Sequence, residues 1–304
     1  MLCCAFMTIF ALNNSNMAKR ILVTGASGFV GSRFVSAMRD RYELLTPSHH
    51  ALDITSAEDV EQYIAHNHPD TILHLAALSN TWYCENNPEE SYKVNVTGVE
   101  NLARAAAKHN AKFVFFSSDQ VYNGNHEQGL LNESVELHPE NHYGRHKLLA
   151  EQRATAACND SVALRATWMY DHRREGMPMH GNFVVNIKNA IESGTPIKFA
   201  TREHRGITWV EEVISNLPHT FSLPGGVYNF GAENSLNSYE TACAYCTLLG
   251  KNPEEIIIAD KDRFPEHKRN ISISMQKATK ASKGAIKFSD TLRGLEIFEK
   301  RNNV

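Results

Sequence analysis

The amino-acid sequence predicts an α/β fold, a doubly wound parallel sheet followed by a smaller and partly interwoven C-terminal lobe. Short apolar runs with strand character alternate with helical patterns through the first half of the chain. Such alternation is typical of a parallel sheet that is covered by helices on both faces. After about Arg165 the pattern loosens, and loops with glycine and proline interrupt it, which indicates a second and less regular lobe.

The expected strands of the first half are Arg20–Thr24, Tyr42–Thr46, Thr71–Leu75, Lys112–Ser117 and Ser161–Arg165. The expected helices are Val30–Arg39, Ala57–His66, Pro88–His109 and Tyr143–Ala157. The second half contains two strand-like runs and one amphipathic helical pattern: Ile197–Ala200, Gly226–Phe230 and Tyr239–Leu249. Ligands of open α/β sheets bind beyond the carboxyl ends of the strands, so we expect the site between the two lobes.

Composition and charge exclude several classes of protein. The 304 residues are 42% hydrophobic with a formal net charge of −3, and their Lys and Arg residues form no long basic stripe. We therefore expect a sizeable core and no nucleic-acid partner. No run of 18 apolar residues occurs, so no membrane span is expected. The six scattered cysteines favour a reducing, cytoplasmic location, and no Cys or His pair has the context of a metal site.

A glycine-rich turn, Thr24-Gly25-Ala26-Ser27-Gly28-Phe29-Val30-Gly31, follows the first strand and opens the first helix. Gly25 permits a tight turn, Gly28 lets the backbone approach a pyrophosphate, and Gly31 lets the helix pack against the strand. The helix N-terminus presents free N–H groups and a positive dipole end to phosphates. This context predicts a Rossmann-type dinucleotide site formed by Gly25, Ser27, Gly28, Phe29, Val30 and Gly31.

The expected dinucleotide is NADP(H), with NAD(H) as the alternative. An enzyme that uses NAD usually places an acid near the end of the second strand, where it holds the ribose 2′-hydroxyl. Residues 45–50 (Leu-Thr-Pro-Ser-His-His) carry no acid, and the first one downstream is Asp53. A 2′-phosphate would not be repelled there, and Arg33 in the first helix is expected to reach it.

Tyr143 and Lys147 lie four residues apart at the start of an expected helix, so both side chains point to the same side. A phenol with a pKa of about 10 is a poor acid at neutral pH, and a nearby lysine cation lowers that pKa. The tyrosine can then protonate a carbonyl oxygen as hydride arrives, or deprotonate an alcohol in reverse. Ser117 and Ser118, at the end of the fourth strand, are placed to orient the same oxygen.

From Met17 onward, these motifs resemble those of the extended short-chain dehydrogenase/reductase family, in the family's order. Further segments that resemble family motifs are Leu52–Thr55, His74–Ala77, Asn95–Asn101 and Ser117–Tyr122. The resemblance implies Ser118, Tyr143 and Lys147 as catalytic residues. Besides the glycine turn, it implies cofactor contacts from Asp53, Ile54, Leu75, Ala76, Ala77, Asn95, Ser117, Tyr143, Lys147 and Arg165.

Within the family, the chain is most similar to the dTDP-4-dehydrorhamnose reductases. Segments that resemble that group are Ser118–Gly124, Leu164–Tyr170, Asn182–Val184 and Arg269–Met275. The resemblance implies hydride transfer from NAD(P)H to C4 of a 4-keto-6-deoxy sugar that is linked to a nucleoside diphosphate. The implied substrate contacts are Ser79, Asp119, Trp168, Tyr170 and Asn182, and a homodimer is common in this family.

Three departures from the family pattern bear on function. Dehydratases of the family carry Asp-Glu after the catalytic hydroxyl, whereas this chain has Asp119-Gln120, and an amide cannot act as that acid or base. His146 stands where a small residue is usual, and Arg205–Thr208 only loosely resembles the group's Gly-x-Pro-Thr segment. Two other functions stay open: an epimerase with tightly bound NAD, and a non-catalytic nucleotide-binding regulatory subunit.

These observations divide the chain into three parts. Residues 1–16 are expected to be a disordered N-terminal extension, because Met17 leads directly into the first strand. Residues 17–165 are expected to form the NAD(P)-binding Rossmann domain. Residues 166–304 are expected to form mainly the substrate-binding lobe, with segments that return to the Rossmann sheet.

Overall fold

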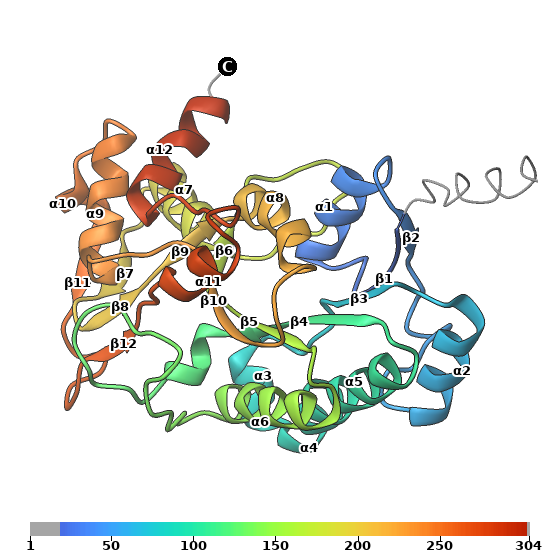
Figure 1. Ribbon diagram of the computed structural model, residues 1–304. Helices are drawn as coiled ribbons and strands as arrows, with labels where there is room; N and C mark the ends of the chain where they lie inside the picture. The colour runs from blue at the N-terminus through green and yellow to red at the C-terminus, as the bar shows by residue number, and fades with distance from the viewer. Residues whose placement is uncertain (1–18, 303–304) are drawn as a thin grey trace, which may run out of the picture.

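A six-stranded parallel sheet forms the centre of the computed structural model, which describes residues 19–302 (Figure 1). The extension expected at residues 1–16 lies outside the described residues. The strands follow the order β10-β5-β4-β3-β1-β2, and all neighbours run parallel. They are β1 (Arg20–Thr24), β2 (Glu43–Leu45), β3 (Thr71–His74), β4 (Lys112–Ser118), β5 (Val162–Ala166) and β10 (Gly226–Phe230). The predicted α/β, doubly wound sheet is confirmed, and its strand order reverses between β1 and β3.

Helices cover both faces of this sheet (Figure 1). One face carries α1 (Phe29–Met38) and α8 (Val210–Thr220), and the other carries α2 (Ala57–Asn67), α5 (Gly98–Lys108) and α6 (His142–Ala157). Side chains alternate between the two faces along each strand. In β1, Ile21 and Val23 therefore join the core beneath α1 and α8, whereas Leu22 joins the core beneath the other three helices.

The stretch 88–109, expected as one helix, is divided in the structure. A short helix, α3 (Thr81–Asn86), precedes it, and then α4 (Pro88–Tyr92) leads into a π-helical turn, η1 (Lys93–Thr97), before α5 begins. The side-chain amide of Asn95, in the π turn, binds the backbone N–H and C=O of Leu78 at 3.1 and 2.9 Å. Turns of this kind are frequent at functional sites. The hydrophobic period of the sequence did not reveal the π turn.

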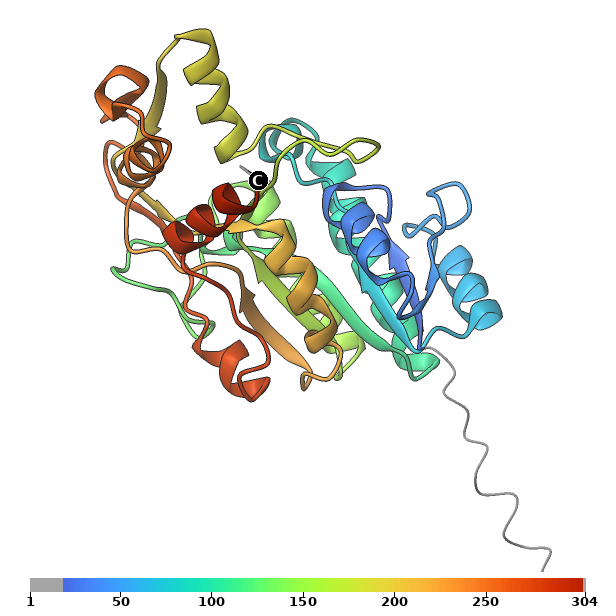
Figure 2. The ribbon, with the colours of Figure 1, turned by 90° about the horizontal axis from the view of Figure 1, so that it is seen from above.

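The remaining elements gather mainly beyond one end of the sheet (Figure 2). Three two-stranded pairs lie there: β6 (Trp168–Tyr170) with β9 (Ile207–Trp209), β7 (Ile197–Ala200) with β11 (Ile257–Asp260), and β8 (Glu203–Arg205) with β12 (Arg269–Ile271). The helices are α7 (Phe183–Ser193), α9 (Ser238–Leu248), α10 (Pro253–Ile256), α11 (Gln276–Ala281) and α12 (Thr291–Asn302). The domain boundary at residue 165 stays a prediction. Within residues 19–302, no helix combines the length and apolar character needed to cross a membrane.

The turn between β1 and α1 depends on close backbone contacts that only glycine permits. Gly25 has a φ of +73°, and a Cβ atom there would lie 2.5 Å from the backbone nitrogen of Ala76. A Cβ atom on Gly31 would lie 2.1 Å from the carbonyl oxygen of Gly25. Side chains are therefore excluded where α1, the end of β1 and the end of β3 meet.

We expect Gly31→Ala to lower the free energy of unfolding by about 1–3 kcal/mol, as overpacking of a close-packed site does. The new methyl group would meet backbone atoms of Gly25 and Ala26, which cannot rotate away. Urea unfolding followed by circular dichroism measures the effect. Gly181→Ala is the matched control, because its Cβ atom would meet only the Asn186 side-chain oxygen, at 3.4 Å. Equal losses in both variants would contradict the packing argument.

Candidate active site

The N-terminus of α1 is open to a phosphate ligand. Gly28 is the N-cap residue and no side chain caps the helix there, so the first N–H groups of α1 are available to a ligand. Ser27 and Gly28 are exposed, and the Gly28 N–H closes the turn onto the Gly25 carbonyl at 2.9 Å. Phe29 and Val30 are half-buried and pack against the core beneath α1. This cradle fits the pyrophosphate of a dinucleotide.

The expectation that Arg33 reaches a 2′-phosphate is wrong. Its side chain is buried, and its Nε atom pairs with the fully buried Asp171 carboxylate at 2.6 Å. The guanidinium also lies over the Phe29 ring, 4.1 Å from the ring centre, and donates to the Phe29 and Pro178 carbonyls. A buried arginine needs such partners. No pattern in the sequence indicated Asp171 as that partner, since it lies 138 residues away.

The segment after β2 offers no free carboxylate to a ribose. β2 ends at Leu45, and the first acid beyond it, Asp53, is exposed. The Asp53 carboxylate accepts hydrogen bonds from the Thr55 N–H and hydroxyl, at 2.8 and 2.7 Å, which lower its pKa. Ile54 packs against Gly98 of α5, and its carbonyl accepts a hydrogen bond from Asn101 of the same helix. The segment after β2 is therefore attached to α5.

The segment after β3 lies against the glycine turn. The Leu75 N–H donates to the Thr24 carbonyl at 3.0 Å, and the backbone of Ala76 contacts Gly25. Ala77 is half-buried and Ser79 is exposed. Asn95 is buried and holds Leu78, so it positions this segment through the backbone. The structure thus brings the predicted cofactor residues of β1 and β3 together.

Ser118, Tyr143 and Lys147 meet at the carboxyl end of β4. Ser118 is the last residue of β4, and its hydroxyl is hydrogen-bonded to the Tyr143 hydroxyl. Tyr143 lies in the first turn of α6, whose N-cap residue Asn141 accepts a bond from Gly144 N–H at 2.7 Å. Lys147, one turn later, is buried, and its Nζ atom donates to the Phe116 carbonyl at 2.8 Å. The predicted catalytic residues therefore form one cluster.

Burial sets the proton affinities in this cluster. It raises the pKa of the Tyr143 hydroxyl well above its ordinary value, and the hydrogen bond with Ser118 only partly offsets the increase. It also lowers the pKa of Lys147 to about 8. We expected Lys147 to lower the pKa of Tyr143, but the lysine nitrogen lies 5.8 Å from the ring centre and burial dominates. Tyr143 is therefore a protonated phenol at neutral pH.

Ser117 and Arg165, expected to contact the cofactor, belong to a buried structural network. The Arg165 guanidinium pairs with both carboxylate oxygens of Glu151 on α6, at 3.0 and 2.7 Å. The Ser117 hydroxyl donates to the same carboxylate, and Arg165 also donates to the Tyr122 hydroxyl at 2.9 Å. All of these side chains are buried. The network joins α6 to β4 and β5.

Two of the expected substrate contacts lie elsewhere. Tyr170 is fully buried and packs edge-on against Phe298 at 5.3 Å, and its ring belongs to the same core cluster as the residues beneath α1 and α8. Asn182 is also fully buried, and its side chain caps α7 by accepting a bond from Val185 N–H at 3.1 Å. The sequence does not show whether the side chain of such an aromatic or amide residue points into the core or toward a ligand. Neither side chain is exposed to a ligand.

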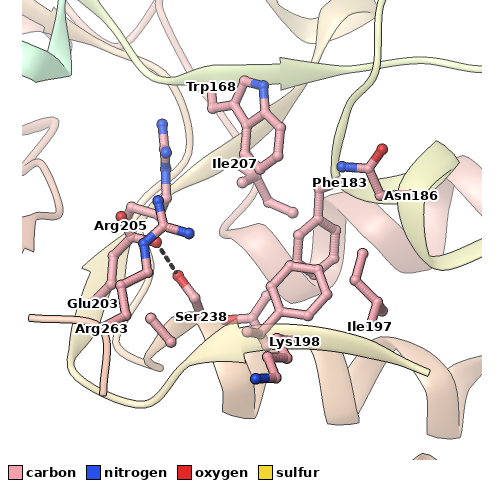
Figure 3. Close-up of a pocket in the computed structure, with 13 residues that line it drawn as sticks. Trp168, Phe183, Asn186, Ile197, Lys198, Glu203, Arg205, Ile207, Ser238 and Arg263 are labelled. Carbon is pink, nitrogen blue, oxygen red and sulfur yellow. Dashed lines mark hydrogen bonds between the residues drawn. The ribbon is translucent and has the colours of Figure 1, made fainter. Parts of the chain in front are cut away.

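A pocket of about 200 Å³ opens in the C-terminal lobe (Figure 3). The aromatic rings of Trp168 and Phe183 lie on one side of it, and the Arg205 and Arg263 side chains lie on the other. The full lining is Trp168, Phe183, Asn186, Ile197, Lys198, Phe199, Ala200, Glu203, Arg205, Ile207, Ser238, Thr241 and Arg263. Of the expected substrate residues, only Trp168 lines it. Sequence reasoning missed both arginines, although Arg205 lies in the segment that loosely resembles a family motif.

Asp119 links this pocket to the catalytic cluster. It is buried next to Ser118, and its carboxylate pairs with Arg205 at 3.1 Å. The Arg205 guanidinium also lies over the Trp168 ring, 5.0 Å from the ring centre. The neighbouring Gln120 accepts a bond from Arg269 at 2.7 Å. The end of β4 is therefore in contact with cationic residues of the second lobe.

Comparison with known proteins identifies relatives along most of the chain. The spore coat polysaccharide biosynthesis protein SpsK of Bacillus subtilis is 26% identical over 226 residues, covering 74% of this chain and 77% of that protein. The dTDP-4-dehydrorhamnose reductase of Mycolicibacterium smegmatis is 27% identical over 252 residues, covering 82% of this chain and 75% of that protein. The crystal structure of dTDP-4-dehydrorhamnose reductase from Yersinia enterocolitica has a TM-score of 0.78 at 27% identity, covering 92% of this chain and 98% of that one.

A second reductase structure, from Bacillus anthracis and in complex with NADP, has a TM-score of 0.78 at 22% identity, covering 94% of this chain and all of that chain. At that identity the likeness shows the fold alone. The RmlD substrate binding domain family matches residues 19–293. The match spans the glycine turn, the Ser–Tyr–Lys cluster and the pocket, and it confirms the family likeness expected from the motifs. The chain belongs to the RmlD substrate binding domain family.

Proposed function

We propose that the protein is an NAD(P)H-dependent reductase of a nucleotide-linked 4-keto-6-deoxy sugar. One observation carries the proposal. Ser118, Tyr143 and Lys147 meet at the carboxyl end of β4, and an aromatic and cationic pocket is joined to them through Asp119 and Arg205. The curated relatives named dTDP-4-dehydrorhamnose reductase support this reaction class.

The cluster can perform the protein's part of a carbonyl reduction. The nicotinamide cofactor, when bound, supplies the hydride. Tyr143 holds a proton at neutral pH and can deliver it to the carbonyl oxygen. Ser118 can hold that oxygen beside the tyrosine through a hydrogen bond. Lys147 is cationic below about pH 8, and it is the residue that we assign to the ribose hydroxyls of the cofactor.

NADP(H) is the proposed cofactor, with NAD(H) as an accepted alternative. The glycine cradle and the uncapped N-terminus of α1 fit a pyrophosphate of either. The exposed residues after β2 carry no acid before Asp53, and the Asp53 carboxylate is already bonded to Thr55. Nothing in this segment therefore repels a 2′-phosphate. The selection of NADP(H) cannot come from Arg33, because Asp171 occupies that guanidinium.

The pocket fits the nucleoside diphosphate portion of the substrate. Trp168 and Phe183 offer aromatic surface for a base, and Arg205 and Arg263 offer the donors that a diphosphate needs. The pocket residue Trp168 follows the carboxyl end of β5 by two residues, and Ser118 ends the neighbouring strand β4. Gln120 cannot serve as the acid or base of a dehydration, and its amide oxygen is occupied by Arg269.

We expect Tyr143→Phe to abolish NADPH oxidation with dTDP-4-dehydrorhamnose as the substrate. The phenyl ring retains the packing of the buried tyrosine but has no proton to donate. Loss of the catalytic acid should lower kcat at least ~10²-fold. Absorbance of the nicotinamide measures turnover, and fluorescence titration with NADPH checks that cofactor binding persists. Wild-type protein that binds NADPH but reduces no 4-keto nucleotide-sugar would refute the proposed function.

The reduction rate should fall as the pH rises through about 8. The folded-state pKa of Lys147 is depressed from its ordinary value to about 8, so the cation is present below that pH and lost above it. Tyr143, whose pKa is raised, stays protonated throughout. A profile of kcat/KM from pH 6 to 10 measures the falling limb. In Lys147→Arg the charge persists, so the limb should move to higher pH. A wild-type profile that stays flat to pH 9.5 would exclude this role.

Arg263→Gln should raise KM for the nucleotide-linked substrate about fivefold, which is the loss of about 1 kcal/mol of hydrogen bonding. We expect kcat to change little, because Arg263 belongs to the lining of the pocket, whereas Ser118 and Tyr143 do not. Arg293→Gln removes an exposed arginine of α12 that pairs with Glu296, and it should leave both constants unchanged. If KM is unaltered in Arg263→Gln, the diphosphate does not bind at this side of the pocket.

A further inference from the structure

The hydroxyl of Ser118 is hydrogen-bonded to three groups of the protein, and two of them, Asp119 and Tyr143, compete for its single proton. It donates to the Asp119 carboxylate at 3.2 Å and accepts a bond from the Gln120 N–H at 3.2 Å. It is also hydrogen-bonded to the Tyr143 hydroxyl. A hydroxyl has one proton and two lone pairs. Ser118 therefore cannot donate to a substrate carbonyl while its proton is held by Asp119.

Asp119 is in turn held by a cation from the second lobe. Its side chain is 2% exposed, and the carboxylate oxygen that does not face Ser118 pairs with Arg205 Nη2 at 3.1 Å. Burial raises the pKa of Asp119, and the charges of Arg205 and Arg269 oppose that increase. A buried carboxylate keeps its charge only with such a partner. The oxygen that faces Ser118 also accepts a bond from the Gln120 side-chain amide at 3.4 Å. The orientation of Asp119, and so of the Ser118 proton, therefore depends on both Arg205 and Gln120.

Arg205 faces the pocket as well as Asp119. It lines the pocket together with Arg263, and its side chain is 17% exposed (Figure 3). Its Nε atom is buried and has no hydrogen-bond partner among the described residues. The Nε atom is out of reach of a ligand, so a ligand in the pocket meets the exposed part of the Arg205 side chain. An anion bound there competes with Asp119 for the same positive charge.

Gln120, the residue after Asp119, also connects an arginine to the catalytic cluster. Gln120 accepts a bond from Arg269 of β12 at 2.7 Å and one from Asn141 at 3.3 Å. Asn141 is the N-cap of α6, which carries Tyr143 and Lys147. A Cβ atom on Gly144 would lie 2.4 Å from the Gln120 carbonyl, so α6 begins in direct contact with this turn. The turn η2 (Asp119–Tyr122) thus contacts both the arginines and the catalytic helix.

We propose that Asp119 is a positioning residue that withholds the Ser118 proton until an anionic group of the substrate engages Arg205. The proposal rests on the proposed function, because the anion is the diphosphate of the nucleotide-linked sugar. An anion in the pocket draws the Arg205 guanidinium toward it, and the paired Asp119 carboxylate is drawn along, away from the Ser118 hydroxyl. The carboxylate can then turn away, and the Ser118 hydroxyl donates to the carbonyl oxygen instead. Binding of the remote diphosphate thereby activates the catalytic hydroxyl.

The test separates the anion from the reacting sugar. A 4-keto-6-deoxy sugar without its nucleotide is the substrate, NADPH is the reductant, and inorganic pyrophosphate is added separately. We expect pyrophosphate to raise kcat/KM for this truncated substrate by roughly 5- to 150-fold, the range of typical couplings between sites. In Asp119→Asn the ratio of rates with and without pyrophosphate should fall to about one. A purely structural Asp119 would lower both rates and leave their ratio unchanged.

Two further variants keep the result interpretable. Glu299→Gln is the matched control: Glu299 is a carboxylate of α12 that is 5% exposed and pairs with Lys188 at 2.9 Å, and it belongs neither to the pocket lining nor to the catalytic cluster. It should keep the pyrophosphate activation of the wild type. Arg205→Gln removes the proposed sensor and should abolish activation even if Asp119→Asn does not fold. Thermal unfolding and NADPH titration verify that each variant is native.

The outcomes separate the two proposals. If wild-type protein reduces no nucleotide-linked keto sugar, the proposed function fails and the role of Asp119 fails with it. If it reduces that substrate but pyrophosphate never accelerates the truncated one, the role of Asp119 alone is refuted. Activation that persists in Asp119→Asn and Arg205→Gln refutes it as well. Activation in the wild type and Glu299→Gln that disappears in the other two variants supports it.

Discussion

The buried ion pair between Glu151 and Arg165 is the interaction on which the geometry of the catalytic cluster depends. Glu151 is 2% exposed, and it lies two turns after Tyr143 on the face of α6 that packs against the sheet. Its carboxylate accepts bonds from Arg165 of β5 and from Ser117 of β4, so one side chain joins the helix to two strands. Loss of either partner would leave an uncompensated buried charge, at a cost of about 3–5 kcal/mol. The distance from Tyr143 to Ser118 follows from this attachment.

Two further buried ion pairs connect the first half of the chain to the second. In each pair, one residue lies next to the glycine turn or next to Ser118. Arg33 of α1 pairs with Asp171, which follows β6, and Asp119 pairs with Arg205 of β8. Helix α1 and the turn after β4 are therefore each attached to the C-terminal half of the chain by a charge pair with little exposure to water. Such pairs are sensitive to a competing charge, because their partners have no solvent to replace them. Ligand binding between the lobes can act on the catalytic residues through these contacts.

The sequence predicted most of the sheet because short apolar strands and the glycine turn are local signals. The runs 20–24, 197–200 and 226–230 match their strands to the residue, and the glycine turn and Tyr143–Lys147 lie where the motifs imply. It did not predict the roles of Arg33, Arg165 or Tyr170. Each of them has a buried partner more than ten positions away: Asp171, Glu151 and Phe298. From their positions in the sequence, Arg33 and Arg165 were both expected to contact a ligand. Their buried carboxylate partners are apparent only in the folded chain. Long-range charge pairing leaves no periodic pattern in one sequence.

Burial keeps Tyr143 protonated at neutral pH, which is the state that a carbonyl reduction needs at its start. No close cation offsets this effect, since Lys147 donates to the Phe116 carbonyl and not to the phenol. The raised pKa also makes the phenol a weak acid, so the transfer of its proton depends on the hydrogen bonds around the carbonyl oxygen. The Ser118 hydroxyl, already bonded to Tyr143, is then the group whose single proton must be redirected for catalysis. The orientation of the Ser118 proton therefore controls the reduction, and Asp119 sets that orientation.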